Sequence, residues 1–172
     1  MFDPTIFENL KVVLEGSVYD LDLDGVILVT NRKDLVDLAT MSRSYMLEFH
    51  SAGDDIGRVS IELSSKMANL GAEIMNSAEE PGCELNLRFF TTVNEVHRTC
   101  SRIHESLNRV WDGRPTISQT LSFLFTEEAP VYENDIRLQF GRKITEDQID
   151  DFPFVIELAL SSLEEIAKIV SR

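Results

Sequence analysis

Apolar residues alternate with other residues in five short segments of the chain, and this period of two constrains the fold most. Successive side chains of a strand point to opposite faces, so each segment predicts a strand with one buried face. The segments are residues 45–49, 59–63, 85–89, 121–125 and 136–140. A loop at 53–57 joins the first two in a hairpin. Asp24-Gly25 predicts a tight turn between two further short strands, one from Val18 and one over 26–29.

Other segments have the spacing of three and four residues that is typical of amphipathic helices. The last of them opens on a capping box formed by Thr145 and Gln148, and Pro153 should kink or restart it. The expected helices are residues 4–15 behind the capping pair Asp3-Pro4, 34–41, 66–78, 93–111 and the region after Thr145. The helix over 93–111 has the clearest pattern.

Strands and helices mixed in this way predict an α+β fold with a mainly antiparallel sheet covered by helices. A chain of 172 residues, of which 43% are apolar, can bury its core as a single domain over residues 1–172. A weak internal echo is also present, because the order strand, helix, hairpin, helix over 26–78 recurs over 84–170. Such an echo is typical of a degenerate tandem repeat.

The chain is strongly acidic, with a formal net charge of −14 from 30 Asp and Glu against 16 Lys and Arg. Binding to phosphates depends on clustered cations, so the balance argues against nucleic acid and anionic membrane as partners. Cys83 and Cys100 are too few for a disulfide framework, and we expect reduced thiols. The N-terminal residues lack the pattern of a signal peptide, and no apolar run has the length of a membrane span. These features predict a cytoplasmic protein.

Catalytic sequence patterns are absent: the chain has no nucleophile elbow, phosphate-binding loop, dinucleotide fingerprint or zinc-protease motif. We therefore expect no enzyme activity and no cofactor. The segment 20–27 matches the first eight positions of a calcium-binding EF-hand loop. Its twelfth position is Asn31 instead of the closing Glu, so a β-hairpin with a polar face is the favoured interpretation and no calcium site is expected.

His97, Cys100 and His104 project to neighbouring angles of the helix over 93–111, and all three are ligand types for zinc. The two His residues lie about 10 Å apart along the helix axis, which is too far to chelate one ion. Cys100 also belongs to the apolar stripe of this helix, where a free Cys behaves as a small hydrophobe. We expect Cys100 in the core with a raised thiol pKa, and no metal site.

The candidate partner-binding residues lie on the charged faces of two predicted helices. Four Arg against three carboxylates make residues 94–114 mildly basic, whereas 144–172 have seven carboxylates against two cations. A solvated surface with local ion pairs explains such faces without any function, and a contact surface for a partner is the alternative. The candidates are Arg98, Arg102, Arg109, Glu157, Glu164 and Glu165.

From residue 93 onward the chain resembles the type III secretion chaperone-like superfamily, which includes small bacterial regulators. The resemblance is carried by residues 107–114 (Leu-Asn-Arg-Val-Trp-Asp-Gly-Arg), the strands at 121–125 and 136–140, and the acidic helix after Thr145. It covers about half of the chain. It implies the order helix, two strands, helix, and non-enzymatic protein binding, often as a homodimer.

The leading hypothesis is a non-catalytic acidic protein-binding module, either chaperone-like or neutralising a basic partner protein as an immunity protein masks a toxin. Its basis is the net charge of −14 and the absence of catalytic patterns. The alternative is a small-ligand sensor or regulatory domain with a pocket between helix and sheet.

Overall fold

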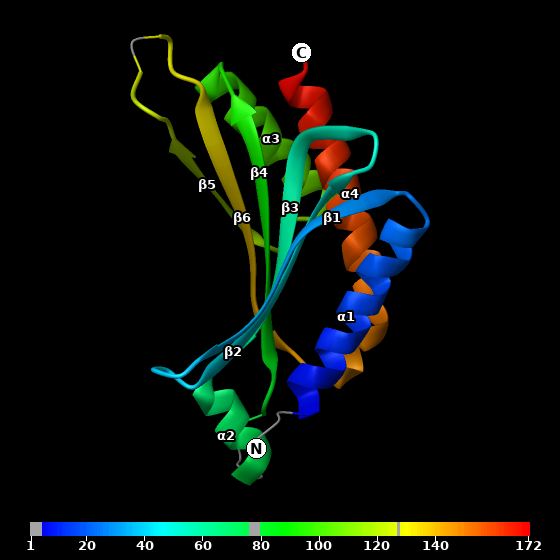
Figure 1. Cartoon of the computed structure of the whole chain (residues 1–172). Helices are drawn as coiled ribbons and strands as arrows, with labels where there is room; N and C mark the ends of the chain where they lie inside the picture. The colour runs from blue at the N-terminus through cyan, green and yellow to red at the C-terminus, as the bar shows by residue number, and fades with distance from the viewer. Residues whose placement is uncertain (1–4, 76–79, 127) are drawn as a thin grey trace.

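The computed structural model describes residues 5–75, 80–126 and 128–172, and its centre is a six-stranded antiparallel sheet (Figure 1). The strand order across the sheet is β1-β2-β3-β4-β6-β5. The strands are β1 (Ile27–Asp37), β2 (Ser42–Ser51), β3 (Asp54–Ser65), β4 (Cys83–Val93), β5 (Thr116–Ser122) and β6 (Tyr132–Ile144). The helices are α1 (Thr5–Leu23), α2 (Met67–Met75), α3 (Val96–Val110), the 3-10 helix η1 (Glu146–Asp151) and α4 (Phe152–Val170). The α+β prediction is confirmed.

Helices α1, α3 and α4 pack against the same face of the sheet, and α4 also packs against both α1 and α3. In Figure 1, α1 and α4 lie side by side to the right of the strands, and α3 lies behind β4. The core forms where their apolar stripes meet the inward residues of the central strands, among them Phe49, Ile61, Leu87, Phe89 and Leu138, which are fully buried. Period-two alternation therefore places the polar residues of these strands on the opposite face of the sheet.

The first helix is longer than predicted, and the expected hairpin at Asp24-Gly25 is wrong. Helix α1 continues to Leu23, and Gly25 follows it with φ of +73°. The amide of Val26 donates to Leu21 O at 2.9 Å and that of Gly25 to Asp22 O at 3.0 Å, which together make a Schellman C-cap. The Asp-Gly pair thus ends a helix instead of turning a hairpin.

The helix predicted over 34–41 is also wrong. Residues 27–37 form the edge strand β1, and residues 38–41 turn into β2. The apolar side chains that suggested a helix face, including Leu35, Val36 and Leu38, are exposed. The segments 26–78 and 84–170 consequently differ in the order of their elements.

The predicted hairpin over 45–63 is confirmed as β2 and β3, with Tyr45 opposite Leu63 and Phe49 opposite Val59. Helix α2 confirms the helix expected from residue 66 as far as Met75, and the rest of that prediction, 76–79, lies outside the described residues. The predicted helix over 93–111 begins later, at Val96, because Val93 belongs to β4.

The capping box before the last helix is confirmed. The Thr145 hydroxyl accepts a hydrogen bond from the Asp147 amide at 3.4 Å, and the Thr145 amide donates to Gln148 Oε1 at 2.7 Å. The box opens η1, and α4 restarts after it with Pro153 in its first turn, as the sequence predicts. The buried residues of α4 include Ile156, Ala159, Leu163 and Ile166, which confirms its apolar face.

The two edges of the sheet differ in their chemistry. Edge strand β1 carries Arg32, Lys33, Asp34 and Asp37 and has a bulge between Val29 and Asn31. Charges and bulges on an edge strand oppose pairing with another chain. Edge strand β5, with the sequence Thr-Ile-Ser-Gln-Thr-Leu-Ser, has no charged residue and no register shift against β6.

An ion-pair cluster ties the β1 edge to helix α1 and strand β2. Asp34 accepts hydrogen bonds from Lys11 Nζ at 2.8 Å and from Arg43 Nη2 at 3.1 Å, and Glu8 contacts both cations. Burial alone would raise the pKa of Asp34, but the hydrogen bonds and charges of Lys11 and Arg43 outweigh it and hold the pKa below its usual range.

Replacing Asp34 by Asn is expected to lower the free energy of unfolding at pH 7 by about 1 kcal/mol, since the pair is partly solvent-screened. A depressed pKa stabilises the fold above the pKa of the unfolded state, and this contribution is lost as the pH falls. The difference between wild type and Asp34→Asn, measured by urea unfolding, should therefore shrink between about pH 5 and pH 2. A difference that stays constant with pH would contradict the role of this carboxylate. Asp55→Asn is the control, because Asp55 has no ion-pair partner among the described residues.

Candidate functional site

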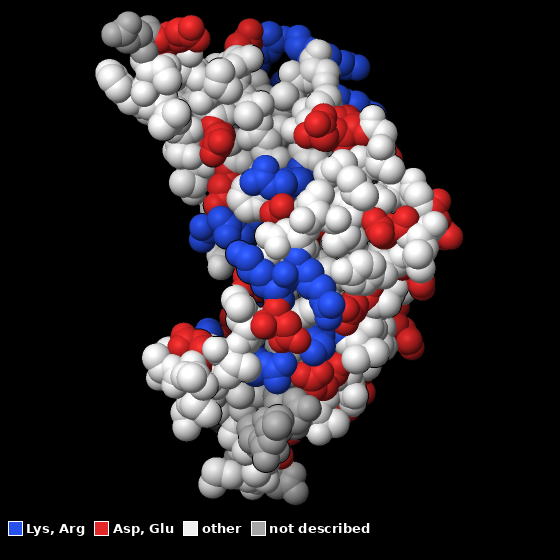
Figure 2. All heavy atoms as spheres, viewed as in Figure 1, with Lys and Arg blue, Asp and Glu red and all other residues white. Residues whose placement is uncertain are grey.

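The uncovered face of the sheet is a mosaic of polar, charged and aromatic side chains. In register across the strands, Arg58 lies opposite Phe90, and Phe90 lies opposite Asp135. In the neighbouring row Arg88 lies opposite Arg137. Figure 2 shows basic and acidic side chains side by side along the middle of the molecule, which is hollowed at the left of this view.

Two guanidinium groups stack on one aromatic ring at the centre of this face. Arg58 lies over the Phe90 ring at 4.6 Å and Arg88 lies over it at 5.0 Å, measured to the ring centroid. Arg58 also forms an ion pair with Glu48 at 3.4 Å. Cation–π contacts of this kind hold long side chains in place on an exposed surface. Phe90 thus anchors one guanidinium group from its own row and one from the neighbouring row on the uncovered face.

Asp135 binds both arginines of the neighbouring row. Arg88 Nε donates to Asp135 Oδ1 at 3.1 Å, Arg88 Nη2 bonds the other oxygen, and Arg137 Nη2 donates at 3.3 Å. Burial would raise the pKa of Asp135, but these hydrogen bonds hold it below its usual range. The bond to Asp135 in turn raises the pKa of Arg88. One carboxylate thus relieves the repulsion of two arginines that face each other across the strands.

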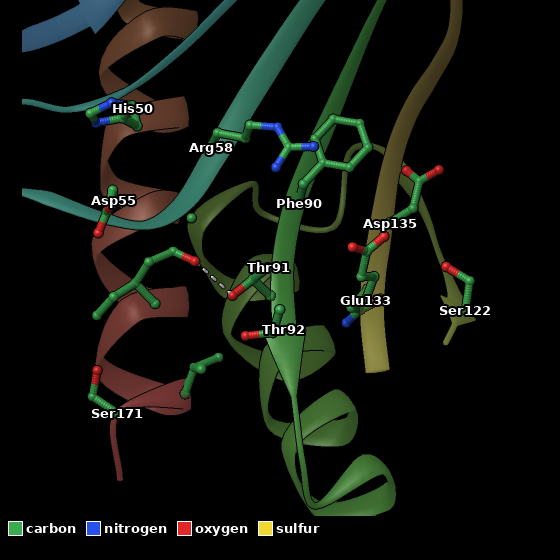
Figure 3. A pocket seen from close by; sticks show the side chains of 14 residues that line it. His50, Asp55, Arg58, Phe90, Thr91, Thr92, Ser122, Glu133, Asp135 and Ser171 are labelled. Atoms are coloured by element: carbon green, nitrogen blue, oxygen red, sulfur yellow. Dashed lines mark hydrogen bonds between the residues drawn. The ribbon is translucent and has the colours of Figure 1, made fainter. Parts of the chain in front are cut away.

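A groove of about 660 Å³ lies at the end of the sheet where β3 and β6 begin and β4 and β5 end. Figure 3 shows Arg58 reaching towards Phe90, with Glu133 and Asp135 projecting from β6. The Thr91 hydroxyl donates to Ile56 O at 3.1 Å, which ties β4 to the start of β3. The C-terminal end of α4, with Ser171, forms the far wall.

The charges that remain unpaired in this groove are negative. Arg58 and Asp135 have ion-pair partners, whereas Asp55 and Glu133 have none within the described part of the chain. An unpaired carboxylate attracts a cation that approaches the surface. The groove therefore complements a basic group.

Beside the groove, the connection from β5 to β6 exposes a cluster of large apolar side chains, called here the apolar end: Phe123, Leu124, Phe125 and Val131. Their exposed fractions are 54%, 82%, 87% and 55%. The predicted strand over 121–125 is thus wrong beyond Ser122, because the chain leaves the sheet there and the two Phe rings do not enter the core. In Figure 2 this projecting end is white with acidic groups. Contiguous exposed apolar residues mark interaction surfaces.

Interior hydrogen bonds hold β5 in place beneath this surface. Gln119 Nε2 donates to Cys100 O at 2.9 Å, and Asn134 Nδ2 donates to Gln119 Oε1 at 2.8 Å. Asn134 is almost fully buried. The edge strand is thereby attached to helix α3 as well as to β6.

The predicted basic partner-binding residues lie on α3. Arg98 is exposed and forms an ion pair at 3.3 Å with Glu95, the N-cap residue of α3. Arg102 is half-buried, and Arg109 is exposed and close enough to Glu165 to lower the pKa of that carboxyl. Local ion pairs therefore occupy part of this face.

The predicted acidic residues lie on α4, which packs against α3. Glu157 and Glu164 are exposed. Glu165 accepts hydrogen bonds from Lys168 Nζ at 2.9 Å and from the Ser106 hydroxyl at 3.1 Å, and these bonds lower its pKa. Glu165 and Arg109 are brought together across the two helices, so their charges serve contacts within the fold. A partner-binding role for all six residues stays a prediction.

His97 and His104 are exposed on α3, and Cys100 is half-buried. The expected core position of Cys100 is correct only in part, although burial does raise its pKa. Cys83 is the more deeply buried thiol, and burial raises its pKa to about 12. Within the described ranges no three His, Cys, Asp or Glu side chains are grouped so as to hold a metal ion.

Sequence reasoning missed the apolar end, because the alternation from Leu121 to Phe125 reads as a buried strand. The signal that could have identified it is the run Thr126 to Val131, whose acidic and Pro residues force a loop close behind the Phe residues. Among the helices that the structure describes, none combines the length and apolar character needed to cross a bilayer.

Comparison with known proteins returns no matching family model, no significantly similar curated protein and no significantly similar solved structure.

Proposed function

We propose that this protein is a non-catalytic, chaperone-like binding module that holds a segment of another protein at the apolar end and the adjoining groove. The observation that carries the proposal is the run Phe123-Leu124-Phe125, more than half exposed at each residue, beside a groove whose unpaired charges are carboxylates. Exposing such a run to water is unfavourable, and a partner that covers it gains hydrophobic free energy.

Charge favours a basic partner. Glu128 and Glu133 flank the apolar end without ion-pair partners among the described residues, and the whole chain has a net charge of −14. Opposite charges on two partners raise the rate of association and the specificity of binding more than they raise the affinity. A segment that combines apolar and basic side chains matches both properties of the surface.

The geometry of the edge strand favours an extended segment. Strand β5 leads into the apolar end, and it has neither the charges nor the bulge that oppose the pairing of β1 with another chain. An extended peptide can add to such an edge through main-chain hydrogen bonds while its side chains contact the flanking surface. A neutraliser of one folded basic protein, the other form of the hypothesis, would rely on charge alone and would leave the apolar end unexplained.

The test uses short labelled peptides in which Lys and Leu alternate, with peptides in which Glu replaces Lys as the comparison. Fluorescence anisotropy should show binding of the Lys peptide at least about tenfold tighter, and added salt should weaken it. Leu124→Ser and Phe125→Ser should each weaken binding by about tenfold, because an apolar anchor is lost.

Leu38→Ser is the matched control, since Leu38 is 80% exposed but lies at the turn between β1 and β2. Equal affinity for the Lys and Glu peptides would exclude a basic partner. A loss of binding in Leu38→Ser as large as that in Leu124→Ser would exclude the apolar end as the docking surface. Sedimentation velocity on the free protein would show whether a second copy occupies β5 instead.

A further inference from the structure

A second groove, of about 550 Å³, lies near the start of edge strand β5, whereas the apolar end follows the end of that strand. The groove is bounded by α4, β6 and the end of α3. Its apolar lining is Trp111, Phe140, Phe154, Val155 and Leu158. A recess of about 50 Å³ adjoins it along Phe140 and Val155 and is lined further by Leu85, Ile144 and Phe152. Both the volume and the apolar lining are in the range of small-molecule sites.

The groove exists because β6 is longer than its neighbour. Strand β5 begins at Thr116, which pairs with Gln139, so residues 140–144 of β6 have no strand beside them on that edge. Gly141 has φ of +66°, a backbone conformation that side chains rarely adopt, where β6 passes the groove. Helix α4 starts across from this unpaired stretch, and the space between them stays open.

Two arginines stand at the rim of this apolar groove without a carboxylate partner. Arg114 follows the α3 turn and Arg142 lies on β6, and neither guanidinium group has an ion pair, hydrogen bond or aromatic contact among the described residues. Asp151 also lines the groove and is likewise unpaired, so the lining has a net positive charge in a protein of −14. The groove also lies at the N-terminus of α4, where the helix dipole favours a negative charge.

We infer that this groove binds a small carboxylate with an apolar body, such as a medium-chain fatty acid. The apolar chain lies along Phe140, Phe154 and Leu158, and the carboxylate meets Arg114 and Arg142. A guanidinium is the side chain best suited to a carboxylate, because it donates two parallel hydrogen bonds. This site is separate from the apolar end and from the peptide-binding proposal.

Trp111 provides the readout, since it is the one Trp of the chain and lines the groove. Decanoate, added below the concentration at which it forms micelles, should change the fluorescence of Trp111 saturably and raise the unfolding temperature. Decanol, with the same chain and no charge, should bind at least about tenfold more weakly. No saturable change, or equal binding of decanol, would overturn the inference.

Removing a positive charge and removing a negative charge from the groove should change the affinity for decanoate in opposite directions. Arg114→Gln and Arg142→Gln should each weaken decanoate binding by roughly tenfold, whereas Asp151→Asn should tighten it a few-fold. Arg98→Gln on the exposed side of α3 is the matched control and should change nothing. Unfolding temperatures of the free variants show whether folding is intact. The site is elsewhere if Arg98→Gln weakens binding as much as Arg142→Gln, or if Leu124→Ser at the apolar end abolishes it.

Discussion

Replacing Phe89 by Ala is expected to lower the free energy of unfolding by about 3–5 kcal/mol. Phe89 lies on the central strand β4, is fully buried, and faces Val59 on one neighbouring strand and Ile136 on the other. Removing its ring leaves a cavity that the closely packed sheet and helices can fill only in part. Urea unfolding followed by circular dichroism measures the loss.

The adjacent residue is the matched control. Phe90 points to the uncovered face and is half-buried between Arg58 and Arg88. Phe90→Ala should cost only about 1 kcal/mol, because it removes two surface cation–π contacts and no core contact. A strand shifted by one residue would exchange the two faces. Larger destabilisation by Phe90→Ala than by Phe89→Ala would therefore contradict the register of β4.

Replacing Trp111 by Ala should also cost about 3–5 kcal/mol. Trp111 ends helix α3 almost fully buried, and its ring packs edge-on against Phe140 with 5.5 Å between centroids. Its Nε1–H donates to the Ser162 hydroxyl of α4 at 2.9 Å. One side chain thus joins α3, α4 and β6, and its removal loosens all three.

Two milder changes separate packing from hydrogen bonding at this position. Trp111→Phe keeps a ring against Phe140 and should cost about 1–2 kcal/mol. Ser162→Ala leaves the indole N–H buried without an acceptor and should cost about 1–3 kcal/mol. Far-ultraviolet circular dichroism during urea unfolding suits all three variants, because it does not depend on the Trp. A cost of less than about 1 kcal/mol for Trp111→Ala would show that the side chain does not hold the helices together.

The strands that bury one face could be predicted from the sequence, because their apolar and polar residues alternate in the same way as their buried and exposed side chains. Residues 59–63 and 85–89 are such cases, with every second residue fully or almost fully buried. The capping box at Thr145 was equally readable, because a local hydrogen-bond pattern needs no tertiary contact. These elements fix the α+β class.

The errors occurred where a local pattern has two physical meanings. Asp24-Gly25 suits a hairpin turn, but a Gly with positive φ also ends helices. Here the residues before it continue helix α1, because Val18 packs in the core as part of that helix. Residues 34–41 have apolar side chains that the structure leaves exposed on an edge strand, so their spacing recorded no burial. Apolar spacing predicts an element only where the side chains are covered.

The candidate sites could not be predicted because the fold assembles them from distant residues. Arg114 lies just before β5 and Arg142 lies near the end of β6, and no local sequence pattern relates the two residues. The groove at the end of the sheet combines residues from β2, β3, β4, β5, β6 and α4. The charged helix faces that the sequence offered instead are partly occupied by local ion pairs, as Arg98 and Glu165 show.

The unequal edges of the sheet determine how far strand pairing between copies could grow. A copy that joined another through β5 would consume its one uncharged edge and turn its β1 edge outward, where the bulge and four charged residues oppose further addition. Growth would stop at a closed pair related by a two-fold axis. If both edge strands could pair with another copy, strand addition could continue into an open fibre. The charges and the bulge of β1 therefore limit the assembly to two copies.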